Sequence, residues 1–271
     1  MDRETLFKCE KVAINVALAA GNMMKSASGG EQRIEQKLSP VDLVTETDKA
    51  VEAFVFNELR KHFPNHKFIG EESATDPTLT NELTWIVDPI DGTMNFVHTF
   101  PWVCISMALV YEKEPIIGVI YSPFLEKMYT AKKGFGAYCN GIPLHVSDCE
   151  SLEKSLILYE LGGYRDEKRI NAIASNLMSL QEECHGLRST GSAALNLCTI
   201  ANGHADGYFQ FDLKCWDLAA GALIVSEAGG YVVDITSDRF DLMRGRIVAA
   251  CNANIAKAVI DKIQVHLKPY I

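Results

Sequence analysis

The amino-acid sequence predicts an α/β (α+β) fold built from layers of helices and sheets. About residues 1–147 combine two amphipathic helical patterns with a series of strand-like runs. About residues 148–271 alternate strands with helices, a pattern typical of an α/β layer. No internal repeat, low-complexity tract or long linker separates the two halves. We therefore expect the 271 residues to form a single unit with a sizeable core.

Two helices are predicted at the start of the first half. Apolar residues recur at steps of three and four over residues 6–24, and Gly29-Gly30 closes that pattern. A second helical pattern runs from about 48 to 63, and Thr45 with Asp48 resembles an N-cap arrangement. Short runs of apolar and β-branched residues then predict strands at 67–70, 85–87, 103–110, 116–121 and 128–131.

The hydrophobic period changes in the second half. Asn140-Gly141 predicts a tight hairpin turn shortly before that change. Beyond residue 150 we expect strands near 155–158, 205–211, 231–235 and 247–250. The helices expected between and after them lie near 166–180, 192–202, 217–228 and 255–267.

The composition is that of an ordinary soluble globular protein, with 48% hydrophobic and 23% charged residues. A net charge of −9 argues against a nucleic-acid partner, which would require a basic patch. No run of 18 apolar residues and no signal-peptide pattern is present, so we expect no membrane association. The eight cysteines form no Cys-x-x-Cys pair and the seven histidines lack zinc spacing, which favours a reducing cytoplasm.

The most informative motif is Asp88-Pro89-Ile90-Asp91-Gly92-Thr93, which directly follows the apolar run Trp85-Ile86-Val87. If that run is a buried strand, Asp88 and Asp91 stand close together at its exit, where open α/β sheets bind ligands. Two carboxylates about 4 Å apart repel by about 4 kcal/mol at an effective dielectric constant near 20. A hard divalent cation such as Mg²⁺ would relieve that repulsion. The alternative interpretation is an acidic turn, since Asp-Pro and Asp-Gly are common turn dipeptides.

Other acidic residues fall at the ends of predicted elements. Glu71-Glu72 follows a short strand, Asp217 opens a helix directly after Trp216, and Asp48 lies in the first turn of its helix. Each has a purely structural alternative, because Asp at a helix start caps free N–H groups and Glu pairs at turns are commonly solvated.

Together these residues resemble the inositol monophosphatase family, and most closely the animal-type inositol 1-phosphatases. The resemblance covers nearly the whole chain in the order of the family's motifs. Its two signatures are the segments 88–96 (DPIDGTMNF) and 216–221 (WDLAAG), the latter followed by Glu227-Ala228-Gly229-Gly230. Further matching blocks are 39–45, 68–73, 191–194 and 240–243. The fold that this resemblance implies is a layered α/β/α/β/α sandwich, and the assembly it implies is a homodimer.

The resemblance also implies a cofactor, a cluster of Mg²⁺ ions. The ligands it implies are Glu71, Asp88, the backbone carbonyl of Ile90, Asp91 and Asp217. Of these, Glu71 and Asp88 would serve the tightest metal, while Asp91 and Asp217 would help to hold further ions and the substrate. Inhibition by Li⁺, which could replace one weakly held ion, is a further implication.

The catalytic residues that the resemblance implies are Thr93, Asp48 and Glu71. Thr93 paired with Asp48 would orient and polarise a metal-activated water for direct attack on phosphorus. The Asp-x-Asp spacing of aspartyl-phosphate phosphatases is absent, so we expect no phosphoenzyme. The reaction implied is Mg²⁺-dependent hydrolysis of inositol monophosphate to myo-inositol and phosphate, a phosphoric monoester hydrolase activity.

The resemblance places phosphate oxygens on the backbone amides of Gly92 and Thr93, which suits a helix N-terminus. Lys37 aligns with a lysine near the entrance of the site. Gln210 stands where the animal enzymes usually carry a glutamate that accepts hydrogen bonds from inositol hydroxyls, so strict substrate preference is open to change. Glu227 is expected to finish a helix rather than to touch substrate. The implied substrate contacts are Glu71, Ile90, Asp91, Gly92, Thr93, Gly191, Ser192, Ala193, Gln210 and Asp217.

Two alternatives to an inositol monophosphatase follow from these observations. One is a phosphatase of the same superfamily that acts on 3′-phosphoadenosine 5′-phosphate or another sugar phosphate. The compact spacing between Glu71 and Asp88 favours the inositol branch. The other is a catalytically idle binding protein that keeps the fold, which the presence of every implied ligand disfavours.

Overall fold

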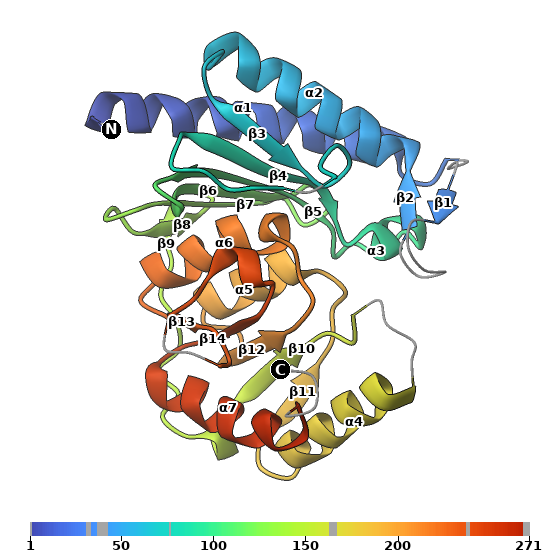
Figure 1. The fold of residues 1–271 in the computed structure, drawn as a ribbon, viewed down its shortest axis with the longest axis vertical. Coiled ribbons are helices and arrows are strands. Elements are labelled where there is room, and N and C mark those ends of the chain that lie inside the picture. Colours follow the sequence, from blue (N-terminus) through green and yellow to red (C-terminus); the bar gives the residue numbers. More distant parts are fainter. Residues whose placement is uncertain are drawn as a thin grey trace.

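The computed structural model describes residues 2–30, 34–36, 43–75, 77–162, 167–236 and 239–267. Its elements form five layers, helices–sheet–helices–sheet–helices, as the sequence resemblance implies (Figure 1). The outer helices on one side are α1 (Arg3–Ala27) and α2 (Glu46–His62), the central pair is α5 (Ala193–Ala201) and α6 (Cys215–Glu227), and the outer pair on the other side is α4 (Glu167–Gln181) and α7 (Ala253–Leu267). The two halves of the chain that meet near residue 147 each contribute one sheet.

The first sheet has seven strands in the order β3-β4-β5-β6-β7-β8-β9. Only β3 and β4 pair in parallel, and every other neighbouring pair is antiparallel. Asn140 and Gly141 join β8 to β9 with φ values of 49° and 79°, which confirms the predicted hairpin turn. The strands are β3 (Lys67–Gly70), β4 (Thr84–Asp91), β5 (Cys104–Tyr111), β6 (Glu114–Ser122), β7 (Lys127–Lys132), β8 (Ala137–Cys139) and β9 (Ile142–Pro143).

The second sheet has five strands in the order β11-β10-β12-β14-β13. Strands β11, β10 and β12 are parallel, so their carboxyl ends meet at one edge of the sheet. Strand β14 runs antiparallel to both of its neighbours. The strands are β10 (Leu156–Tyr159), β11 (Gly186–Arg188), β12 (Gly207–Gln210), β13 (Tyr231–Val233) and β14 (Ile247–Ala250).

Several short elements lie outside the sequence predictions. Strand β11 is only three residues long and carries no alternating pattern, so periodicity gives no sign of it. The others are the β1–β2 ribbon (Ile34–Gln36 and Leu43–Thr45), helix α3 (Thr93–Val97) and the 3₁₀ turns η1 (Leu152–Lys154) and η2 (Leu242–Arg244). In the described part of the chain, no helix is long and apolar enough to cross a membrane.

Strand β4 corrects one sequence prediction. The strand predicted at 85–87 continues to Asp91, so Asp88 and Asp91 lie within it rather than in a turn after it. All eight residues of β4 are buried. Its pairing register with β5 shifts between Asp88 and Asp91, where Pro89 has no N–H group for a sheet hydrogen bond. The continuous apolar run ends at Val87 because Asp88 and Asp91 face an interior acidic cluster, whereas Ile90 between them still packs in the core.

Helix α6 packs closely on the first sheet. An ideal Cβ built on Gly118 of β6 would lie 2.8 Å from the carbonyl oxygen of Ala220 in α6, so only glycine permits this approach. At the C-terminal end of α6, the Glu227 carboxylate accepts hydrogen bonds from the backbone amides of Gly134 (2.7 Å) and Gly136 (2.8 Å), which follow β7 of the first sheet. Helix α6 is thereby fixed to the first sheet, although it belongs to the second half of the chain.

We expect Gly118→Ala to lower the free energy of unfolding by about 1–3 kcal/mol, because the clash is with backbone atoms that cannot rotate away. Thermal melts of the purified protein would measure the loss. Gly30→Ala is a matched control, since its Cβ would make only an ordinary contact of 3.5 Å with the carbonyl oxygen of Ala27. Equal melting temperatures for Gly118→Ala and wild type would contradict the close packing of α6.

Candidate metal centre and active site

Three aspartates from opposite halves of the chain meet at the inner face of the first sheet. Asp88 and Asp91 come from β4, and Asp217 comes from the first turn of α6. One carboxylate oxygen from each lies within 4.8 Å of the others. The packing of α6 on β5 brings Asp217 to this place, with a hydrogen bond of 3.3 Å from Ser106 Oγ to the carbonyl oxygen of Trp216.

The electrostatics of this cluster are unfavourable for three free carboxylates. Burial, followed by the charges of Glu71, Asp91 and Asp217, raises the pKa of Asp88 well above its ordinary value. Burial, followed by the charges of Glu71 and Asp91, raises the pKa of Asp217 well above its ordinary value. Burial also raises the pKa of Asp91, to about 6, although several hydrogen bonds oppose that shift. A site of this kind favours either protonation or a bound cation.

The donor set fits a hard divalent metal ion. The three clustered groups are carboxylates, the ligands that Mg²⁺ and Ca²⁺ prefer, and in the described residues no histidine or cysteine belongs to the cluster. Carboxylate pairs at 4.8 Å repel by about 3 kcal/mol each at an effective dielectric constant near 20. Positive charge between them would turn that repulsion into attraction. Asp88 and Asp91 of the DPIDGT motif are therefore placed, with Asp217, close enough together to bind a metal ion.

Glu71 lies directly after β3, beside the three aspartates. Its charge raises the pKa of both Asp88 and Asp217, and its backbone amide donates to the carbonyl oxygen of Val87 at 3.3 Å. The buried Glu52 of α2 holds this loop, because its carboxylate accepts the amide of Glu72 at 2.8 Å. Sequence reasoning missed Glu52. The available sign was its position one helical turn after Asp48, on the same face of α2.

Thr93 and Asp48 are in contact, as the sequence resemblance implies. The Thr93 hydroxyl lies 3.2 Å from Asp48 Oδ1 and 3.1 Å from the carbonyl oxygen of Ile90. Asp48 is held in turn by Thr45, whose amide donates to Asp48 Oδ2 at 2.8 Å and whose hydroxyl donates to the same oxygen. This is the capping box of α2, and it confirms the predicted N-cap arrangement. Burial raises the pKa of Asp48, opposed by these hydrogen bonds.

Asp91 has a second role, at the start of α5. Its carboxylate accepts the backbone amides of Ala193 (3.2 Å) and Ala194 (2.9 Å) and the hydroxyl of Ser192. Ser192 Oγ in turn accepts the amide of Leu195 at 3.2 Å, which makes it the N-cap of the helix. The acidic cluster and the start of α5 are therefore one connected structure.

The two glycines of the site, Gly92 and Gly191, lie against each other. Gly92 has a φ of 92° and Gly191 a φ of 83°, a conformation that glycine adopts without strain. A Cβ on Gly92 would approach the carbonyl oxygen of Gly191 to 3.2 Å, and a Cβ on Gly191 would meet the Asn95 amide at 2.8 Å. Asn95, which belongs to the signature 88–96 but was assigned no role from the sequence, donates to the carbonyl oxygens of Thr190 (2.8 Å) and Trp102 (2.9 Å).

Gln210 is the last residue of β12 and is buried. Its amide oxygen accepts the hydroxyl of Tyr208, a fully buried side chain. That contact orients the amide so that its two N–H donors point away from Tyr208. Lys37, which the resemblance placed near the entrance, lies outside the described residues.

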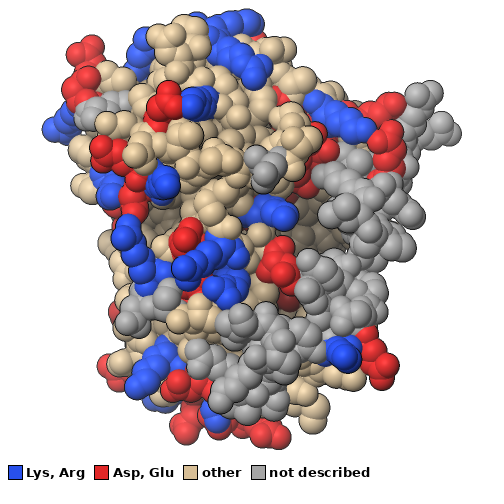
Figure 2. Space-filling view, in the orientation of Figure 1, with Lys and Arg blue, Asp and Glu red and all other residues tan. Residues whose placement is uncertain are grey.

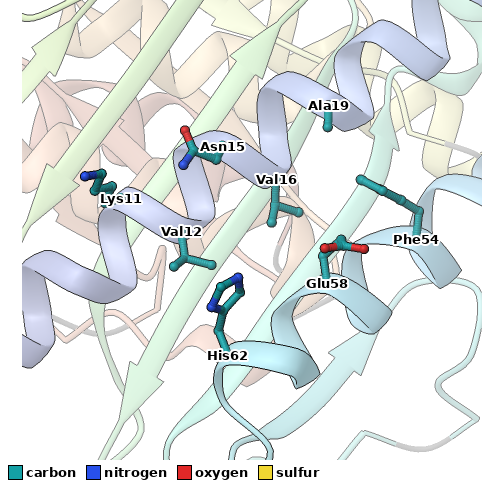
Figure 3. Close-up of a pocket in the computed structure, with 8 residues that line it drawn as sticks. All are labelled: Lys11, Val12, Asn15, Val16, Ala19, Phe54, Glu58 and His62. Carbon is teal, nitrogen blue, oxygen red and sulfur yellow. The ribbon is translucent and has the colours of Figure 1, made fainter.

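Two surface features are separate from this site. A groove of about 240 Å³ lies between α1 and α2, lined by apolar residues such as Val12 and Phe54 and by the charged or polar Lys11, Glu58 and His62 (Figure 3). It shares no residue with the acidic cluster. On the face shown in Figure 2, basic and acidic side chains are interspersed over the described surface. Two of the three clustered aspartates, Asp88 and Asp91, are buried by contrast.

Comparison with known proteins gives a consistent result. The chain matches the model of the inositol monophosphatase family over residues 6–268. Human inositol monophosphatase 1 is 44% identical over 262 residues, which cover 95% of each chain. The extragenic suppressor protein suhB from Bartonella henselae superposes with a TM-score of 0.87 at 32% identity, covering 96% of this chain and 98% of that one. A dual specific IMPase/NADP phosphatase, solved with D-inositol-1-phosphate, gives a TM-score of 0.81 at 25% identity over 95% of each chain.

These similarities define a phosphoric monoester hydrolase with a mixed α/β fold of two sheets flanked by helices. More specifically, the chain belongs to the inositol monophosphatase family.

We expect Asp88→Asn to stabilise the protein when a chelator has removed divalent metal ions. The amide keeps an oxygen for the amide of Ile90, which now donates to Asp88 Oδ1 at 3.0 Å, but removes one of three repelling charges. Without metal, the variant should melt several degrees above wild type at about pH 7.5, and added Mg²⁺ should raise its melting temperature less than that of wild type. Differential scanning fluorimetry with and without Mg²⁺ measures both effects.

The pH dependence supplies a control. Folding raises the pKa of Asp88 well above its ordinary value and that of Asp91 from 3.8 to about 6, so protonation of these groups on acidification favours the folded state. Because Asp88→Asn lacks the Asp88 charge at every pH, the gap in melting temperature between metal-free wild type and the variant should narrow as the pH falls through the raised pKa values. Asp261→Asn, at an exposed position of α7, should change neither melting temperature. A metal-free Asp88→Asn protein less stable than wild type at about pH 7.5 would contradict the cluster's electrostatics.

Proposed function

We propose that the protein hydrolyses inositol monophosphate to myo-inositol and phosphate in a Mg²⁺-dependent reaction. One observation carries the proposal: Asp88, Asp91 and Asp217 converge to within 4.8 Å at the inner face of the first sheet. The family to which the chain belongs, and its 44% identity to human inositol monophosphatase 1, support the choice of substrate.

The residues that would hold the cofactor are Glu71, Asp88, Asp91, Asp217 and the carbonyl oxygen of Ile90. When bound, Mg²⁺ supplies positive charge that acidifies a water molecule and shields the phosphate oxygens and the leaving alkoxide. The protein's part is to fix the carboxylates before substrate arrives. Asp91 is fixed by α5, and Glu71 by the Glu52 contact in its loop.

Thr93 and Asp48 would position the attacking water. The Thr93 hydroxyl has one proton, which it donates to Asp48 or to the Ile90 carbonyl, so its oxygen lone pairs remain available to accept a hydrogen bond from water. In the reaction, the water oxygen bonds to phosphorus while the bond from phosphorus to the alcohol oxygen breaks. One water proton passes to the Thr93–Asp48 pair, and the departing alkoxide takes a proton from a solvent water to become the free hydroxyl of inositol. The hydroxide that this leaves recovers the proton from the Thr93–Asp48 pair. No covalent bond to the protein is required.

The remaining contacts proposed for the substrate divide into two sides. The backbone amides of Gly92 and Thr93 would bind the phosphate oxygens. Gly191, Ser192, Ala193 and Gln210 would line the alcohol side, at the start of α5 and the end of β12. We further infer a homodimer in a reducing cytoplasm and sensitivity to Li⁺, supported by the resemblance to the animal enzymes and by eight free cysteines.

A second candidate substrate class is a nucleotide or another sugar phosphate. The specific observation in its favour is Gln210, because Tyr208 occupies the amide oxygen and leaves N–H donors for the pocket. An N–H donor suits groups that only accept, such as the carbonyl and ring-nitrogen acceptors of a nucleotide, whereas an inositol hydroxyl can bind either a donor or an acceptor. The solved structure described as a dual specific IMPase/NADP phosphatase is an example of this fold in a protein named for both an inositol phosphate and a nucleotide substrate.

A substrate panel tests the proposed function. We expect phosphate release from inositol 1-phosphate to depend on added Mg²⁺ and to exceed release from 3′-phosphoadenosine 5′-phosphate and from NADP. Gln210→Glu should sharpen the preference for the inositol ester by about fivefold or more, since a charged acceptor replaces an amide whose oxygen is already bonded. If the protein released phosphate faster from the nucleotides than from inositol 1-phosphate, a nucleotide would be the better substrate assignment. If it released no phosphate from any of these esters in the presence of Mg²⁺, the proposed hydrolase activity would be refuted.

Thr93→Ala should lower kcat for inositol 1-phosphate by about 100-fold or more, because the variant loses the group that orients water. Thr93→Ser keeps the hydroxyl and should retain kcat within about tenfold of wild type. Steady-state kinetics at saturating Mg²⁺ give both values, and a melt of each variant checks the fold. Equal losses for Ala and Ser would assign Thr93 a packing role instead.

A further inference from the structure

Glu160, which sequence reasoning did not single out, accepts four hydrogen bonds from one loop and the helix that follows it. Its Oε1 accepts the backbone amides of Thr190 (2.7 Å) and Gly191 (2.8 Å) and the side-chain amide of Asn196 (2.8 Å). Its Oε2 accepts the hydroxyl of Ser189 at 2.7 Å. Three of the four donors therefore converge on a single carboxylate oxygen, Oε1, and the fourth binds the other.

The topology of the second sheet explains the position of Glu160. It directly follows β10, the middle strand of the parallel set β11-β10-β12. The loop Ser189–Gly191 follows β11, and Gln210 ends β12. The carboxyl ends of parallel strands form the edge where α/β sheets bind ligands. Glu160 therefore stands at the centre of that edge, between the loop and Gln210.

The loop Ser189–Gly191 is also held from the other half of the chain. Asn95 of α3 donates to the carbonyl oxygen of Thr190, and Gly191 lies against Gly92. The next residue, Ser192, donates its hydroxyl to Asp91. The loop thus bridges the acidic cluster and the start of α3 on one side and Glu160 on the other. A change in its position would move the groups proposed to line the alcohol side of the pocket.

We propose that Glu160 is a positioning residue, which fixes the loop Ser189–Gly191 and so shapes the pocket for the alcohol part of a phosphate monoester. Glu160 holds the loop because its side chain is long enough to place its carboxylate oxygens within hydrogen-bond distance of the loop, and not because the carboxylate is charged. This assignment of a specificity role rests on the proposed function, because it requires a substrate whose alcohol part enters the pocket between this loop and Gln210.

Three variants distinguish the effect of side-chain length from the effect of the negative charge. Glu160→Gln loses the charge but keeps an oxygen in place of Oε1 for three of the donors, while its NH₂ faces a Ser189 hydroxyl that can accept. Glu160→Asp keeps the charge but is one methylene too short to reach the loop. Glu160→Ala removes both. Glu153→Ala, an exposed glutamate before the other end of β10, is the matched control.

Amide hydrogen exchange of the segment that contains Thr190 and Gly191 is the first readout, and it does not depend on activity. We expect exchange to rise by about tenfold or more in Glu160→Asp and Glu160→Ala, and to stay within about threefold of wild type in Glu160→Gln and Glu153→Ala. Unchanged exchange in both Glu160→Asp and Glu160→Ala would overturn the proposal. Faster amide exchange in Glu160→Gln, together with a wild-type rate in Glu160→Asp, would also overturn the proposal. The charge of Glu160, and not the length of its side chain, would then be what holds the loop. If Glu160→Ala does not fold, the comparison of Asp with Gln still decides.

The second readout is substrate selectivity, measured as kcat/KM for inositol 1-phosphate and for p-nitrophenyl phosphate, an ester whose alcohol part carries no hydroxyl groups. Glu160→Asp should lose about tenfold on the inositol ester and less than about threefold on the aryl ester. Equal losses on the two esters would overturn the specificity role. Failure of wild type to cleave inositol 1-phosphate while cleaving the aryl ester would refute the proposed substrate, and the exchange data would still decide whether Glu160 holds the loop.

Discussion

The mutual repulsion of Asp88, Asp91 and Asp217 is the constraint on which the rest of the structure depends. Three carboxylates within 4.8 Å must be held together by packing elsewhere, because their own interaction drives them apart. Helix α6 does this by lying directly on the backbone of β6 at Gly118, while Glu227 ties its far end to the same sheet. The folding energy of both sheets is thus used to maintain an arrangement that only a cation or protons can relieve.

Two aspartates of the site, Asp48 and Asp91, each connect two segments of the chain through hydrogen bonds. Asp48 is both the capping-box residue of α2 and the partner of Thr93. Asp91 belongs to the cluster and also receives the N-terminal amides of α5. The hydrogen bonds that cap α2 and α5 therefore also fix the Thr93 hydroxyl and the Asp91 carboxylate in place.

Helical and strand periodicity was sufficient to predict a mixed α/β fold, because long amphipathic patterns are strong local signals. The layered sandwich and the full acidic cluster followed from the resemblance to the inositol monophosphatase family, whereas the DPIDGT motif alone indicated only Asp88 and Asp91. The extent of β4 was missed because its continuation past Val87 begins with Asp88 and Pro89, which read as a turn, and β11 was missed because three residues show no period. Glu52 and Glu160 were missed because each is a single polar residue whose hydrogen-bond partners lie in another segment of the chain, so no local pattern identifies it. Asn95 lies in the recognised signature 88–96, but its contact with Thr190 is not visible in that motif.

The cluster joins β4 to α6, and these elements are separated by much of the chain. A growing polypeptide that has completed the first sheet already contains Asp88 and Asp91, but it lacks Asp217 until most of the second half has been synthesised. All three carboxylates of the cluster are therefore together only after α6 has docked on the first sheet. Until then the first sheet has neither α6, which covers its inner face, nor the third carboxylate, so its apolar face is exposed in the unfinished chain.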